Sequence, residues 1–139
     1  MDVDLERLVT ERAHHCCEYC RMPQEFERAP FQLEHIIAEQ HGGRTAFSNL
    51  ALACLRCNKH KGPNIAGIDP LTGNLVPLFH PRRQKWSRHF RWRGPYLVGR
   101  SQIGRATIMV LAINHPYAVA ARRALMEENL FPRAWNHRS

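Results

Sequence analysis

The sequence predicts an α+β domain in which short strands and helices surround a metal site made of four cysteines. Cys17 and Cys20 form one Cys-x-x-Cys pair, Cys54 and Cys57 form a second, and 33 residues separate the two pairs. The chain has 139 residues, of which 44% are hydrophobic and 23% charged, without an internal repeat. This composition is typical of globular proteins. The length fits one domain, and we expect a single domain over residues 1–139.

The four paired cysteines predict a structural zinc ion. A two-residue spacer lets both thiolates of a pair turn toward one ion, and two pairs supply the four ligands of a tetrahedral zinc site. Four sulfur ligands leave no position open for water. Core cysteines and a redox Cys-x-x-Cys pair are the alternatives, and two matched pairs argue against both. The fifth cysteine, Cys16, is expected to be a packed thiol.

The segment between the pairs is longer than the roughly 15–20 residues of a simple zinc ribbon, so it is expected to have its own structure. Through this region we expect a helix over residues 5–14, a loop over 21–31, a strand over 31–38, a strand over 50–54 and a helix over 56–61. Asp4 is the expected cap of the first helix, and Gly62 the expected end of the last. Gly42 and Gly43 predict a tight loop between the strands.

The second half of the chain is expected to form a hairpin followed by two structural helices. After a turn-rich stretch over residues 69–74, we expect an apolar run over 75–79, hairpin strands over 90–92 and 96–98, a helix from Ser101 to Asn114 and a helix over 116–128. Ser101 is the expected cap of the first of these helices.

The charge is divided unevenly along the chain. The net charge is +8, but residues 1–69 hold 8 basic and 10 acidic side chains, whereas residues 70–139 hold 12 basic and 2 acidic ones. No acidic residue occurs from Pro70 to Met126. Such a half-chain attracts polyanions, with nucleic acid the first candidate and an anionic membrane surface a distant second. A solvated basic face is the alternative.

Membrane insertion and secretion are not expected. No run approaches the ~18 apolar residues of a membrane span. The N-terminus, Met1-Asp-Val-Asp-Leu-Glu6, is acidic and lacks the apolar segment of a secretory signal. We therefore expect a protein of the reducing cytoplasm.

A second set of residues lies between and beside the cysteine pairs. It comprises Glu34-His35, Gly42-Gly43, Asn49-Leu50 and Cys57-Asn58-Lys59-His60-Lys61. In order and spacing, the segment from Cys17 to Asn64 resembles the HNH endonucleases. The resemblance implies a ββα-metal core of about residues 14–66, stapled by the Cys₄ zinc site, and leaves a basic extension of about residues 67–139. It also implies hydrolysis of DNA phosphodiester bonds.

The resemblance assigns roles to individual residues. His35 corresponds to the general base that takes a proton from the attacking water, and imidazole suits that task near neutral pH. Glu34 and Asn58 correspond to ligands of one catalytic Mg²⁺ or Mn²⁺ ion, which would stabilise the leaving oxygen. The family more often has Asp at the position of Glu34. Adjacent strand residues also point to opposite faces, so the strand must end, twist or bulge for Glu34 and His35 to share a site.

The remaining motif residues have supporting roles in this resemblance. Asn49 corresponds to the central asparagine that orients the loop and the base. Arg56 and Lys61, on the same short helix, are expected to steady the phosphate. Taken alone, Asn49 is equally a turn residue, and Asn58 is equally a helix-start residue. A non-catalytic, zinc-stabilised nucleic-acid-binding module is therefore the competing hypothesis.

A basic segment over residues 82–93 is the expected nucleic-acid contact. It holds six basic side chains interleaved with three aromatic ones. The basic residues are Arg82, Arg83, Lys85, Arg88, Arg91 and Arg93. Alternating spacing places Phe90 and Trp92 toward the core and the neighbouring arginines toward solvent, where guanidinium groups bind phosphate without reading sequence. The choice between DNA and RNA, and between monomer and homodimer, stays open at this level.

Overall fold

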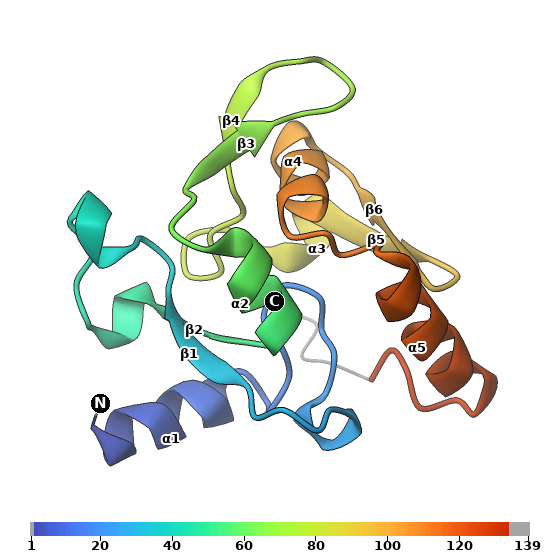
Figure 1. Ribbon diagram of the computed structural model, residues 1–139, viewed down its shortest axis with the longest axis horizontal. Helices are drawn as coiled ribbons and strands as arrows, with labels where there is room; N and C mark the ends of the chain where they lie inside the picture. Colours follow the sequence, from blue (N-terminus) through green and yellow to red (C-terminus); the bar gives the residue numbers. More distant parts are fainter. Residues whose placement is uncertain (1, 134–139) are drawn as a thin grey trace.

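The computed structural model describes residues 2–133, and within them six short strands pair into three two-stranded antiparallel sheets (Figure 1). The strands are β1 (Gln32–His35), β2 (Leu50–Ala53), β3 (Ala66–Ile68), β4 (Leu75–Pro77), β5 (Phe90–Arg93) and β6 (Tyr96–Gly99). The α-helices are α1 (Val3–Arg12), α2 (Leu55–Lys61), α3 (Trp86–His89), α4 (Gln102–Val110) and α5 (Pro116–Glu127). Three short 3₁₀ turns are η1 (Gln24–Phe26), η2 (Glu39–His41) and η3 (Phe47–Asn49). The predicted α+β class is confirmed.

The first sheet and the helix after it form a ββα unit. β1 pairs with β2 so that His35 lies opposite Leu50, and α2 follows β2 and packs against both strands. α1 packs against β2 from another side, where Val9 and Ala13 form a small core with Leu50 and Leu52 (Figure 1). The predicted order of strand, loop, strand and helix is therefore present.

The second half of the chain packs against this unit through a shared core. The β5–β6 hairpin and the projecting β3–β4 hairpin both contact α4 (Figure 1). The larger apolar cluster contains Tyr19 and Ile36 from the first half together with Phe79, Phe90 and Leu111 from the second. The predicted hairpin and the Ser101 cap are present, with the Ser101 hydroxyl accepting from the Gly104 amide at 3.0 Å. None of the described helices is long and apolar enough to cross a membrane.

The first helix differs from its prediction at both ends. Its cap is Asp2, whose carboxylate accepts from the Asp4 amide at 2.8 Å, and Asp4 lies inside the first turn. A negative charge in that turn is favourable because it faces the positive end of the helix dipole. The helix ends at Arg12 because the backbone turns left-handed at His14 and His15, with φ values of 54° and 58°.

Two further elements, β1 and α4, are shorter than predicted. β1 ends at His35, and the next two amides, of Ile36 and Ile37, donate to the backbone and side-chain oxygens of Asn49. α4 ends at Val110 because the backbone turns left-handed at Ala112, with a φ of 50°.

The sequence patterns missed two elements. Hairpin β3–β4 forms where a turn-rich stretch and an apolar run were expected, and α3 is a single turn inside the basic segment. The hairpin is held to α4 by Asp69, whose carboxylate accepts two hydrogen bonds from Arg105 at 2.8 and 2.9 Å.

Candidate functional site

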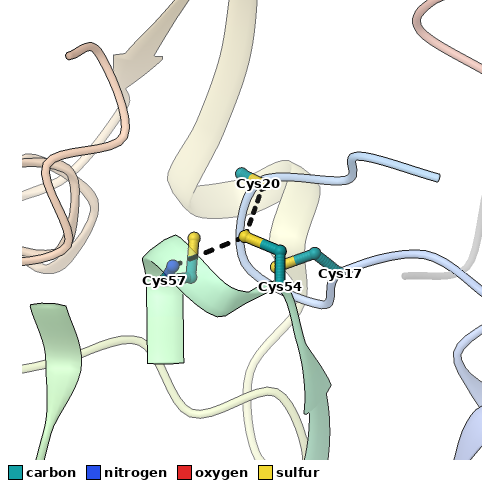
Figure 2. A group of neighbouring side chains, drawn as sticks. All are labelled: Cys17, Cys20, Cys54 and Cys57. Atoms are coloured by element: carbon teal, nitrogen blue, oxygen red, sulfur yellow. Dashed lines mark hydrogen bonds between the residues drawn. The ribbon is translucent and has the colours of Figure 1, made fainter. Parts of the chain in front are cut away.

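Four buried cysteine sulfurs meet at the junction of the N-terminal segment, β2 and α2 (Figure 2). The Sγ atoms of Cys17, Cys20, Cys54 and Cys57 lie within 4.8 Å of one another, and those of Cys20 and Cys54 are 3.8 Å apart. A tetrahedron with Zn–S bonds of about 2.3 Å places its sulfurs about 3.8 Å apart. The cluster therefore fits a structural zinc ion, as predicted. Cys16 is buried but lies outside the cluster.

Tyr19, in the spacer of the first cysteine pair, reaches from the zinc site to β1. Its side chain is fully buried, and its hydroxyl donates a hydrogen bond to Oε1 of Glu34. Its backbone carbonyl accepts from the Trp86 indole at 2.9 Å. One spacer residue thus links the zinc site to the motif carboxylate and to the basic extension.

Glu34 is sealed between β1 and α2. Its relative exposure is 5%, and its Oε2 lies 3.1 Å from Nζ of Lys61, which is 1% exposed. The Lys61 ammonium also donates to the Ile36 carbonyl at 2.9 Å. Burial raises the pKa of Glu34, and the Lys61 charge and the Tyr19 hydrogen bond oppose that rise. Lys61 therefore neutralises a buried carboxylate, and its ammonium does not reach the surface where phosphate was expected to bind.

Asn58 lies on the same side of β1 as Glu34. Its Nδ2 donates to Oε1 of Gln32 at 2.6 Å, and Gln32 and Glu34 share one face of the strand because side chains alternate. The structure thus brings both predicted ion ligands to the space between β1 and α2.

These two residues do not form a divalent-ion site as arranged. Carboxylate and amide oxygens are the donor types that Mg²⁺ prefers. The Glu34 carboxylate is buried and already bound by an ammonium, and an ion at the same oxygen would face that positive charge. Among residues 2–133, only the four cysteines bring three or more Cys, His, Asp or Glu ligand atoms together. The residues therefore do not fit the ion unless Lys61 leaves Glu34.

His35 faces away from Glu34, toward the loop between β1 and β2. Its Nε2 lies 2.8 Å from Oγ1 of Thr45 and 3.5 Å from Oε1 of Glu39, and its side chain is 20% exposed. No hydrogen bond within the described residues joins His35 to Glu34. β1 does end at His35, but the two side chains leave the strand on opposite faces.

Asn49 holds this loop closed. Its Oδ1 accepts from the Ile37 amide at 2.9 Å, and its Nδ2 donates to the carbonyls of Ile37 and Arg44 at 3.0 and 2.8 Å. Gly42 takes a φ of 86°, which favours glycine. A Cβ on Gly43 would lie 1.7 Å from the Ile37 carbonyl oxygen, so the loop can close only with glycine there.

The family comparison identifies this region. Residues 17–64 match the family model described as HNH endonuclease. The chain carries an HNH domain. The matched segment contains the four clustered cysteines, the Glu34-His35 pair and Asn58, and an HNH domain indicates nuclease activity on a nucleic acid. Searches of curated proteins and of solved structures found no match.

The basic segment outside the HNH match is divided between surface and interior. Five of its basic side chains are exposed: Arg83, Lys85, Arg88, Arg91 and Arg93. The sixth, Arg82, instead pairs with the buried carboxylate of Glu18 and is 16% exposed. Phe90 is buried and Trp92 half-buried, in agreement with the predicted alternation, and Arg56 on α2 is partly exposed.

Sequence reasoning missed three residues around the HNH motif. Tyr19 contacts Glu34, and Thr45 and Glu39 lie against His35. Nothing in the spacing distinguishes Thr45 from other polar loop residues. The burial of Tyr19 could have been predicted from its position, because a large aromatic residue inside a tight Cys-x-x-Cys spacer is expected to pack inward.

Proposed function

We propose that the protein is an HNH endonuclease that hydrolyses DNA phosphodiester bonds with His35 as the general base. The observation that supports this most is the placement of His35. Its imidazole lies at the end of β1 inside the family-matched segment, partly open to solvent and held by the loop that Asn49 closes. A partly exposed imidazole can contact both water and a phosphate group.

The proposed reaction is a water-mediated displacement. The His35 imidazole takes a proton from water, the water oxygen bonds to phosphorus, and the bond to the 3′ oxygen breaks. The departing 3′ oxygen takes a proton from solvent water, and His35 returns its proton to solvent. The products are 5′-phosphate and 3′-hydroxyl ends. One such site cuts one strand, so we propose nicking, with double-strand breaks requiring a second visit or a second copy.

The phosphate backbone is proposed to lie along the exposed residues of the basic segment. Arg83, Lys85, Arg88, Arg91 and Arg93 present their charges to solvent, and no acidic residue lies near them in sequence. Guanidinium and ammonium groups bind phosphate oxygens without selecting bases. We propose that the enzyme acts in a reducing compartment, because none of its five cysteines is in a disulfide.

The resemblance adds a catalytic Mg²⁺ or Mn²⁺ on Glu34 and Asn58. The Lys61–Glu34 pair disagrees with that assignment, so no step of the proposed reaction is drawn through the ion. The same pair favours a second candidate function, a nucleic-acid-binding module without catalysis, since a sealed carboxylate cannot act on substrate.

Plasmid nicking separates the two candidates. Supercoiled DNA is incubated with wild type, with His35→Ala and with His60→Ala, in Mg²⁺, Mn²⁺ or chelator. His60 is the matched control because it is an exposed histidine that bonds only its own helix carbonyl. We expect wild type and His60→Ala to nick DNA and His35→Ala to fail. DNA binding without nicking by any variant would support the binding module.

A further inference from the structure

We propose that Arg12, on helix α1, is a positioning residue that holds Asn49 and, through it, the loop beside His35. The effect on DNA cleavage rests on the proposed function, whereas the hold on the loop does not. The family match begins at residue 17, so Arg12 reaches this loop from a helix outside the matched segment. Helix α1 packs against β2, which brings Arg12 to the start of that strand (Figure 1).

The Arg12 guanidinium binds the chain on both sides of Asn49. Its Nη1 donates to the Phe47 carbonyl at 2.8 Å, and its Nη2 donates to the Leu50 carbonyl at 2.6 Å. The guanidinium carbon also lies 3.7 Å from the centre of the Phe47 ring. Charged donors bind carbonyl oxygens more strongly than neutral ones, and two donors in one planar fork fix two acceptors relative to each other. One side chain therefore fixes the short segment that contains Asn49.

This segment carries the hydrogen bonds that close the loop. The Asn49 side chain bonds both polar groups of Ile37 and the carbonyl of Arg44. Leu50, the next residue, lies directly opposite His35 in the pairing of β1 with β2. A shift of the segment would therefore break the bonds across the loop and move the residue that is paired with His35.

The third donor of Arg12 shows that its placement serves the two carbonyls. Nε is buried and has no hydrogen-bond partner among the residues that the structure describes. A buried donor without a partner lowers stability, so this orientation of the guanidinium favours its contacts with the Asn49 segment over the fold as a whole. Arg82 also reaches the Leu50 carbonyl, but at the longer distance of 3.4 Å. Arg12 is therefore the main side chain that holds the segment from outside the family match.

Amide hydrogen exchange measures the hold on the loop without reference to activity. The Ile37 amide donates to the Asn49 side chain at 2.9 Å. The Leu97 amide donates to the Asn114 side chain at the same distance and is the internal reference. In Arg12→Ala, the Ile37 amide should exchange at least about tenfold faster relative to Leu97, because the loop opens locally. Arg12→Lys keeps the charge but not the fork, so it should show a smaller increase, and it carries the test if Arg12→Ala does not fold.

The nicking assay measures the effect on cleavage. Arg12→Ala should lower kcat about tenfold with little change in KM, because its guanidinium is already bound to backbone carbonyls. Guanidinium ion at non-denaturing concentration should restore part of that rate. Arg7→Ala should exchange and nick as wild type does, since Arg7 is an exposed arginine on the same helix.

Three results would overturn the proposal: equal acceleration of the Ile37 and Leu97 amides, no acceleration of either, or an Arg12→Ala protein that nicks DNA with the wild-type kcat. If no protein nicks DNA but Arg12→Ala still loses protection at Ile37 alone, Arg12 holds the loop as proposed and the nuclease proposal fails.

Discussion

The hydroxyl of Tyr19 donates a hydrogen bond to Glu34, and this bond connects the zinc site to the strand that carries His35. Tyr19 lies between two cysteines of the sulfur cluster and is fully buried. When the first cysteine pair folds around the ion, it therefore also places the Tyr19 hydroxyl against the Glu34 carboxylate.

Tyr19→Phe is expected to lower the free energy of unfolding by about 1–3 kcal/mol, because a buried carboxylate oxygen loses its partner. Urea unfolding measures the loss, and zinc content should stay unchanged since all four thiolates remain. Tyr117→Phe is the matched control, because Tyr117 is 77% exposed. Equal stability of the two variants would contradict the link.

Zinc is expected to be bound at about one ion per chain and to be needed for folding. Cys57→Ser should lose both the metal and the folded state, as seen by metal analysis and circular dichroism. Cys16→Ser should keep both, because Cys16 lies outside the sulfur cluster. A folded, zinc-free wild-type protein would refute the assignment.

Arg82 and its neighbour Arg83 are expected to have different roles. Arg82 pairs with the buried Glu18, so Arg82→Met should destabilise the fold by about 2–4 kcal/mol by leaving that carboxylate without its partner. Arg83→Met should leave unfolding unchanged, because Arg83 is exposed. If both variants unfold at the same urea concentration as wild type, the pairing of Arg82 with Glu18 does not stabilise the fold.

Reversing two exposed charges is expected to weaken DNA binding. Arg88→Glu combined with Arg91→Glu should lower affinity and flatten the salt dependence of binding, because fewer phosphate counterions are released. Binding titrations over a range of salt concentrations measure both effects. Arg123→Glu, on the exposed side of α5, is the control for a charge reversal outside the basic segment. If DNA affinity depends on salt concentration in the same way in all three proteins, the basic segment does not contact DNA.

His80 is expected to make stability depend on pH. Burial, with the charges of Arg83 and Arg82, lowers the pKa of His80 to about 4, and its Nδ1 accepts from the Arg82 amide at 3.2 Å. The unfolded chain therefore binds the proton first as pH falls. The stabilising contribution is present above pH 6.5, the ordinary value, and is lost between 6.5 and about 4.

The comparison uses His80→Asn, which keeps a side-chain acceptor but does not titrate. Between pH 7 and pH 5, wild type should lose about 1 kcal/mol more unfolding free energy than the variant, after allowance for solvent screening. Urea unfolding at both pH values gives the difference, in which acid effects on the zinc site cancel. Parallel losses in the two proteins would show that His80 is not the titrating group.

Local patterns in the sequence were enough to predict much of the fold. The cysteine pairs predicted the sulfur cluster, Gly42 and Gly43 predicted a tight loop, and the Ser101 cap predicted the start of α4. Each of these depends on spacing or backbone conformation within a few residues. The ends of β1 and α4 were predicted less well, because β1 gives way to bonds with the distant Asn49 and α4 stops at a left-handed turn at Ala112.

The site was less predictable for the same reason. Sequence reasoning placed Lys61 at phosphate, but folding buries its ammonium against Glu34, 27 positions earlier in the chain. It also could not detect that Thr45 lies beside His35, since nothing but the closed loop brings them together. Residue types indicated which side chains carry chemistry, whereas their partners depend on packing between segments.

The central claim, that His35 is the base of a nuclease, is tested most directly by chemical rescue. DNA cleavage by excess His35→Ala is measured with and without added imidazole, beside wild type and His60→Ala. We predict a loss of about 10²–10⁴-fold in the cleavage rate of His35→Ala, partly restored by imidazole, and no effect of imidazole on the control. Cleavage by His35→Ala at the wild-type rate without imidazole would contradict the claim.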